Sequence, residues 1–166
     1  MAAHTQLSVE EYLRASFDGP DPDYAGGEIV ERHLGGIPHS MAQGNLAGVL
    51  HGLAQKLSLH VCPELHLRLG PRRIRVADIA VFRGERPTEE IPSTPPFIAI
   101  EILSPDDRFA EVLAKFEDYR QWGVEHCWFV DPRNRKIYVY SAGLSEVPAF
   151  VIPELALEIP ADEIFR

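Results

Sequence analysis

The chain has 166 residues, 45% hydrophobic and 25% charged, which is the composition of an ordinary globular domain. Its formal net charge of −9 argues against a protein that coats nucleic acid with a basic surface, but it leaves room for a nuclease whose acids cluster around metal. No apolar run reaches the roughly 18 residues of a membrane helix. The first residues lack the basic start and apolar core of a signal peptide, so a cytoplasmic location is expected.

The N-terminal half predicts a short helix followed by one long helix and a strand pair. Ser8 and Glu11 have the spacing of a capping box, and the Pro-, Gly- and Asp-rich segment 17–27 predicts a loop. Apolar residues recur at helical or alternating spacing in the segments beyond this loop. They predict a weak strand at 28–34, a helix at 40–57, and strands near 61–69 and 73–82.

The C-terminal half repeats the mixture of strands and helices. A polar, Pro-rich loop separates an apolar strand, 97–103, from the preceding one, and an amphipathic helix at 107–122 places Pro105 and two acids at its start. Strands near 126–131 and 136–142 follow, and the tail predicts one or two short strands. No linker divides the chain, so we expect one domain over residues 1–166, mixed α/β (α+β), with a central mixed sheet flanked by helices.

Asp78 is the first residue that its surroundings do not explain. In the stretch RVADIAVF it lies on the same strand face as Val76, Ala80 and Phe82. A buried and unpaired carboxylate costs several kcal/mol, or becomes protonated. Asp78 therefore needs a compensating charge.

Glu101 is a second acid of this kind, in the stretch FIAIEILS. Acids on two neighbouring strands repel each other unless a cation lies between them. A divalent metal would stabilise both, and oxygen ligands favour magnesium, manganese or calcium over zinc. Lys115, on the helix after the Glu101 strand, lies at the edge of the apolar stripe, where its long side chain could reach back to the carboxylates.

These residues resemble the PD-(D/E)XK nuclease superfamily, and more closely its bacterial branch of restriction-endonuclease-like proteins. The matching stretches, in order, are DYAGGEIVE, PHSMAQGNLAGVL, RVADIAVF, PPFIAIEILSP, KFEDYRQWGV and HCWFVDPRNRKIYVY. The resemblance implies a restriction-endonuclease-like core and a metal-dependent endonuclease that hydrolyses DNA with magnesium or manganese.

The resemblance also assigns roles to single residues. Asp78 and Glu101 match the two metal-binding acids, and Lys115 matches a catalytic lysine that this branch carries on the helix, since Leu103 occupies its usual strand position. Three further positions match auxiliary residues of the branch: Asp23, His39 and Glu111. Lys115 would orient the attacking water or neutralise charge in the transition state.

Simpler interpretations remain open for most of these residues. Asp78 can pair with an arginine, Glu101 can pair with Lys115 without metal, and Asp23 can be an ordinary loop acid. A basic cluster brackets the 70–73 turn and is either solvated or a phosphate-contacting edge, with Arg72 and Arg73 as the candidate contacts. Its members are Arg68, Arg72, Arg73 and Arg75.

A second function class also remains open. The acidic charge and the aromatic residues near the C-terminus are compatible with a non-catalytic protein that keeps the nuclease fold and acts through association. In either case we expect a homodimer, the commonest closed assembly, and no membrane. The two cysteines, Cys62 and Cys127, are expected to be small buried thiols.

Overall fold

Two apolar strands form the centre of the sheet, as their sequences predict. β4 (Arg73–Arg83) is buried at every position except its two end residues, and β5 (Ile98–Ile102) is buried throughout. They run antiparallel, with Ile79 opposite Ile100 and Ala80 opposite Ala99. The expectation that Asp78 and Glu101 lie on neighbouring strands is therefore confirmed.

The structure is a computed structural model that describes residues 6–166. The absence of a signal peptide was inferred partly from residues 1–5, which lie outside the described residues. In chain order the elements are α1 (Val9–Arg14), β1 (Asp23–Ala25), β2 (Glu28–Val30), α2 (Ile37–Leu57), β3 (Leu59–Gly70), β4, β5, α3 (Phe109–Trp122), β6 (His126–Asp131), β7 (Lys136–Tyr140), β8 (Leu144–Val147), β9 (Ala149–Ile152), η1 (Pro153–Leu155), β10 (Leu157–Pro160) and α4 (Ala161–Ile164).

The main sheet is mixed and has eight strands in the order β2-β1-β4-β5-β6-β7-β8, with β3 paired to the other edge of β4. Only the β5–β6 pair is parallel among the paired strands described, because α3 forms a crossover between them. β9 and β10 form a separate antiparallel hairpin. This is the expected mixed α+β class with a central mixed sheet.

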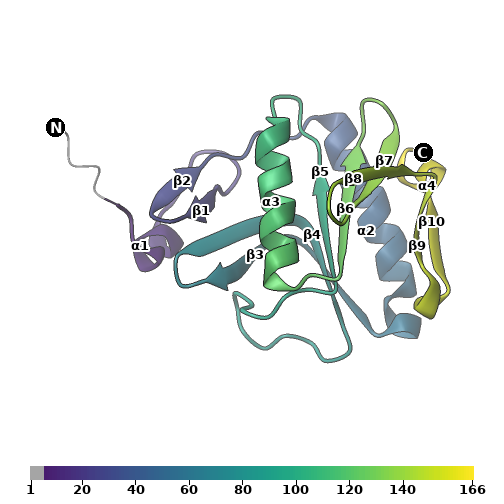
Figure 1. The fold of residues 1–166 in the computed structure, drawn as a ribbon, viewed down its shortest axis with the longest axis horizontal. Coiled ribbons are helices and arrows are strands. Elements are labelled where there is room, and N and C mark those ends of the chain that lie inside the picture. The colour runs from purple at the N-terminus through teal and green to yellow at the C-terminus, as the bar shows by residue number, and fades with distance from the viewer. Residues whose placement is uncertain (1–5) are drawn as a thin grey trace.

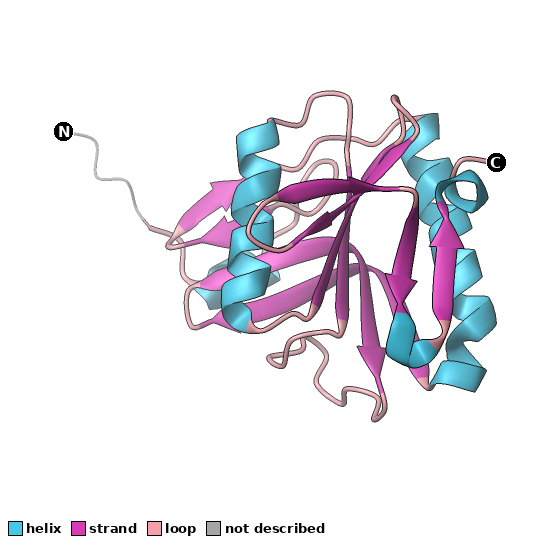
Figure 2. Ribbon diagram, turned by 45° about the vertical axis from the view of Figure 1, so that its right-hand side comes forward, coloured by secondary structure: helices cyan, strands magenta, loops and turns pink. Residues whose placement is uncertain are grey.

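Helices cover both faces of this sheet (Figures 1 and 2). On one face α2 packs with the β9–β10 hairpin over a core that includes Leu46, Ile79 and Ile100. On the other face α3 packs through Phe116 and Tyr119 over Ala80 and Ala99. Alternate residues of β4 and β5 thus enter different cores, so a side chain at Asp78 or Glu101 lies on the α3 side.

Several boundaries differ from the sequence predictions for local reasons. α2 begins three residues early, at Ile37, because Pro38 is tolerated in the first helical turn. α3 begins at Phe109 because Pro105 lies in a separate turn, where Asp107 accepts a hydrogen bond from the Ser104 amide. β1 forms within the predicted loop, and β8 was not predicted at all.

Other local predictions are confirmed. Ser8 and Glu11 form the capping box of α1 reciprocally, and the tail contributes two short strands. Both cysteines are free thiols, with Cys127 buried and Cys62 partly buried. Among residues 6–166, no helix has the length and apolar character to cross a membrane.

Candidate active site

The site lies where the edge of β4 passes from one partner strand to another. β1 pairs with the start of β4, at Arg73 and Ile74, and β5 pairs with it only from Ile79 onward. The residues between, 75–78, face a gap in the ladder, and a buried backbone group in such a gap needs another partner. Side chains supply it: Asp23 Oδ1 accepts a hydrogen bond from the Val76 amide at 2.7 Å, and Lys115 Nζ donates to the Val76 carbonyl at 2.8 Å.

Asp78 and Glu101 stand at the β5 end of this gap. Asp78 directly precedes Ile79 and Glu101 directly follows Ile100, and those two isoleucines are paired. In an antiparallel pair, residues opposite each other point to the same face. The two acids are only 4% and 6% exposed, so their charges must be compensated inside the protein.

Glu101 is held by α3 through both carboxylate oxygens. Lys115 Nζ donates to Oε2 at 2.8 Å, and the Tyr119 hydroxyl donates to Oε1 at 2.7 Å. Burial raises the pKa of Glu101 to about 7; Lys115 opposes that rise, while the Asp78 charge adds to it. Of Asp78 and Glu101, Glu101 is therefore the acid that takes up a proton first when the pH falls.

Asp78 is held from the opposite side of the cavity. Arg32 Nη2 donates to Oδ1 at 2.8 Å, the Ile102 amide donates to Oδ2 at 2.6 Å, and His39 Nε2 lies 3.5 Å from Oδ2. Burial alone would raise the pKa of Asp78, but the hydrogen bond from His39 and the charges of Lys115 and Arg32 outweigh it and lower the pKa. Asp78 thus stays ionised when Glu101 does not.

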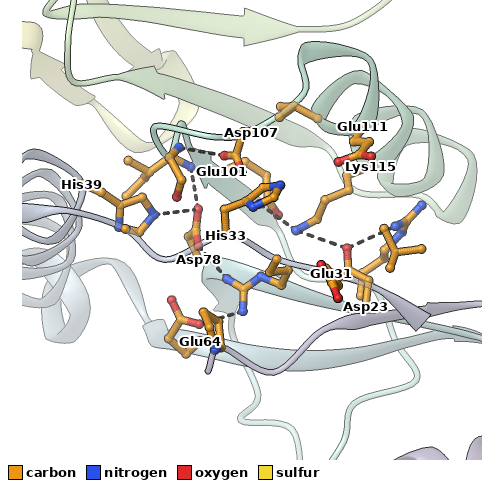
Figure 3. A pocket seen from close by; sticks show the side chains of 18 of the residues that line it. Asp23, Glu31, His33, His39, Glu64, Asp78, Glu101, Asp107, Glu111 and Lys115 are labelled. Atoms are coloured by element: carbon orange, nitrogen blue, oxygen red, sulfur yellow. Dashed lines mark hydrogen bonds and ion pairs between the residues drawn. The ribbon is translucent and has the colours of Figure 1, made fainter. Parts of the chain in front are cut away.

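The lysine of the site is itself buried. Lys115 is 8% exposed, and besides Glu101 it lies 3.7 Å from Asp23 Oδ2. Burial lowers the pKa of Lys115, but Asp23 and Glu101 more than offset this and raise it above its ordinary value. Figure 3 shows the Lys115 side chain extending from α3 toward Asp23 and Glu101.

Asp23 belongs to this charge network rather than to a loop. It is 1% exposed at the start of β1, and Arg75 Nη1 donates to its Oδ2 at 3.1 Å. Arg75 also bonds Asp118 of α3 through two nitrogens. Each buried acid of the site is consequently matched by a cation of the chain, and the pairings of Asp78 with an arginine and of Glu101 with Lys115, both left open by the sequence, are present.

The side chains surround a cavity of ≈ 230 Å³ between α2, α3 and the sheet. Most of its lining residues are polar or charged, and they carry both signs of charge (Figure 3). The ionisable lining residues are Asp23, Glu31, Arg32, His33, His39, Glu64, Arg75, Asp78, Glu101, Asp107, Arg108, Glu111 and Lys115.

The donor chemistry fits a hard divalent cation held by two carboxylates. In the part of the chain that the structure describes, no three His, Cys, Asp or Glu side chains are grouped so that they could hold a metal. Magnesium characteristically uses only one or two carboxylates and completes its shell with water and substrate phosphates. Asp78 and Glu101 meet that requirement, provided that Arg32 releases Asp78.

Of the remaining predicted site residues, some line the cavity and others lie outside it. His39 and Glu111 line the cavity, His39 against Asp78. Arg72 and Arg73 do not line it: Arg72 bonds the Gln6 side chain and the Gly26 carbonyl, and Arg73 pairs with Asp118. Arg75, from the same basic segment, is the one that reaches the cavity.

Sequence reasoning missed three residues that contact the acids: Arg32, Arg75 and Tyr119. The sequence did indicate that Arg75 is buried, since it lies within the run of apolar residues that forms β4. Tyr119 has the helical spacing of the apolar stripe along 107–122 and would be taken for a core residue, although a buried tyrosine hydroxyl normally finds a hydrogen-bond partner. Arg32 follows a short exposed strand and carried no signal in the sequence.

Comparisons with known proteins bear on the family and the fold of the chain. A family model described as "Uma2: Putative restriction endonuclease" matches residues 9–161. A solved structure described as a "putative nuclease belonging to DUF820", from Anabaena variabilis, is similar at a TM-score of 0.82 and 23% identity, covering 96% of this chain and 97% of that chain. At this identity the similarity shows a shared fold. No curated protein matches the chain.

Proposed function

This chain belongs to the Uma2 family, described as "Putative restriction endonuclease", and from that premise we propose that it hydrolyses phosphodiester bonds in DNA with magnesium or manganese as cofactor. One observation carries the proposal: Asp78 and Glu101 are buried opposite each other on paired strands, with Lys115 bonded to Glu101. A fold that needed only a stable core would gain little from burying three ionisable groups, because buried ion pairs are weak sources of stability.

The chain's own residues have distinct tasks in this reaction. Asp78 and Glu101 would hold the ion, which when bound supplies Lewis acidity toward an attacking water and offsets the charge of the phosphate. Lys115 would stabilise the negative charge that develops as water adds to phosphorus and the phosphate ester bond breaks. Tyr119 would keep the Glu101 carboxylate oriented, since it fixes the oxygen that Lys115 does not contact.

A cleavage assay with a matched control tests this proposal. Supercoiled plasmid and short duplex DNA are incubated with the protein in magnesium or manganese. Asp78→Asn should lose cleavage by roughly a hundredfold or more. Asp131→Asn is the control, because Asp131 is also a buried aspartate in a strand of the sheet but bonds only the turn after β6. Equal cleavage by wild type and Asp78→Asn would contradict the proposal.

The second candidate is a non-catalytic protein that keeps this fold and acts through association. The internal charge balance of the site favours it, because every carboxylate oxygen of Asp78 and Glu101 already has a donor of the chain within 3.5 Å. The net charge of −9 also opposes tight binding to DNA. A purified wild-type protein that cuts neither substrate with any divalent metal would place this candidate first.

A further inference from the structure

Arg32 holds the position that a metal ion would need. It follows β2 and reaches into the cavity, where its side chain is only 13% exposed. Its Nη2 donates to Asp78 Oδ1 at 2.8 Å, so the guanidinium neutralises the acid that remains ionised most readily. A guanidinium is charged at every accessible pH, so it cannot leave Asp78 by losing a proton and must move instead.

A second acid keeps Arg32 at the mouth of the cavity. Nη1 donates to Glu64 Oε2 at 3.0 Å and to the Asp21 carbonyl at 3.3 Å. Glu64 is about half exposed, in contrast to Asp78, so Arg32 bridges a buried and a solvated carboxylate. Arg32 can thus turn away from Asp78 while it keeps a partner at the surface.

Glu64 is placed for this task by an unusual backbone. It lies in β3, and the residues directly before and after it pair with the residues on either side of Asp78. Its φ of 50° is in the left-handed region, which non-glycine residues seldom adopt. Gln43 of α2 fixes it further, since Nε2 donates to Glu64 Oε1 at 2.8 Å and to the Asp78 carbonyl at 2.9 Å. Strained residues of this kind concentrate at functional sites.

We propose that Arg32 is a positioning residue that occupies the Asp78 carboxylate in the free protein and moves to a DNA phosphate when substrate binds, so that metal and DNA bind cooperatively. This rests on the proposed nuclease function. The planar guanidinium suits the exchange, because it pairs in two-pronged fashion with phosphate as well as with carboxylate. The free protein then binds divalent ions weakly, and a phosphate in the cavity removes the competing charge.

Calorimetric titration of Mn²⁺ into metal-free protein tests the competition without any readout of activity. Arg32→Gln removes the charge, and we expect it to bind Mn²⁺ roughly tenfold more tightly than wild type, or better, because a cation in contact with the ligand is lost. Arg83→Gln is the control, because Arg83 ends β4 outside this cavity and lies over the Phe97 ring. The Mn²⁺ affinity of this variant should stay within about twofold of wild type. Arg32→Lys keeps a charge without the planar fork and should fall between the two.

The same titration with a short duplex bearing non-hydrolysable linkages tests the coupling. The duplex supplies phosphate ligands to the ion in both proteins, but it displaces Arg32 only in wild type, so it should tighten Mn²⁺ binding to wild type several-fold more than to Arg32→Gln. If Arg32→Gln does not give a folded circular dichroism spectrum, Arg32→Lys decides in its place, with tighter Mn²⁺ binding than wild type expected.

The outcomes separate the two proposals. If wild type binds Mn²⁺ and cuts DNA but the Arg32 variants bind no more tightly, the role of Arg32 is overturned and the nuclease function stands. If neither wild type nor the variants bind Mn²⁺ with or without the duplex, the metal-dependent function is overturned together with the role of Arg32.

Discussion

Replacing Lys115 with methionine should destabilise the protein by an amount that grows with pH. Methionine keeps most of the side-chain volume but removes the charge next to Glu101 and the donor to the Val76 carbonyl. A buried carbonyl left without its donor costs about 1–3 kcal/mol. At pH 6, where Glu101 is mostly protonated, this cost and the lost attraction between Lys115 and Asp23 make up the effect.

Above neutral pH the lost charge adds to this cost. In wild type Glu101 keeps its proton up to a pKa of about 7, against an ordinary value of 4.5, so the free energy of unfolding falls between these pH values and then levels off. Without Lys115 the pKa of Glu101 rises further, and the fall continues. The difference between wild type and Lys115→Met should therefore widen by about 1.4 kcal/mol per pH unit above pH 7, or about 3 kcal/mol by pH 9.

Urea unfolding at pH 6, 7, 8 and 9, followed by tryptophan fluorescence, measures this difference. Trp128 is a suitable probe because it is buried and stacked on Phe150. The control is Lys115→Met in a Glu101→Gln background, where the cost should be the same at pH 6 and pH 9. A difference between wild type and Lys115→Met that stays flat from pH 6 to pH 9 would refute the view that Lys115 holds Glu101 in its ionised form.

Two further outcomes are expected. Tyr119→Phe removes the hydroxyl that donates a hydrogen bond to Glu101, and it should lower the free energy of unfolding by about 1.5–3 kcal/mol at pH 8. The loss should be smaller at pH 6, where Glu101 is mostly neutral. An equal loss at both pH values would show that the hydroxyl does not favour the charged carboxylate. We also propose that the protein is a homodimer, in which a partner strand adds to the edge of β8 that pairs with no other strand of residues 6–166. Light scattering at tens of micromolar should then give twice the chain mass of 18.6 kDa, and a monomer mass would end that proposal.

The two buried acids of the site are balanced by cations of the chain itself. Asp78 and Glu101 look like a metal centre because two acids at neighbouring buried positions repel each other. The chain resolves this repulsion with Arg32 and Lys115, one cation for each acid. A pair of buried carboxylates therefore indicates a functional site, but it does not by itself identify the cation that occupies it.

The sequence alone determined the main elements around the site and the position of the acids Asp78 and Glu101 within them. Periodic burial is a local property, so the alternation along 73–82 and 97–103 and the helical spacing along 40–57 and 107–122 were enough to locate β4, β5, α2 and α3 to within a few residues. The same alternation placed Asp78 and Glu101 among buried neighbours. The reach of Lys115 toward Glu101 also followed, because only 14 residues separate the two.

Only the tertiary structure decided which cation meets which acid. Arg32 is 46 residues from Asp78, and Arg75 is 52 residues from Asp23. With 16 Lys and Arg against 25 Asp and Glu, the sequence allows many pairings, and ion pairing has no period that would single out one of them. The pairs are selected by the gap on the edge of β4 between β1 and β5, where the amide and carbonyl of Val76 meet no strand and bond Asp23 and Lys115 instead. That gap depends on where two distant strands stop pairing, which is a property of the packed sheet.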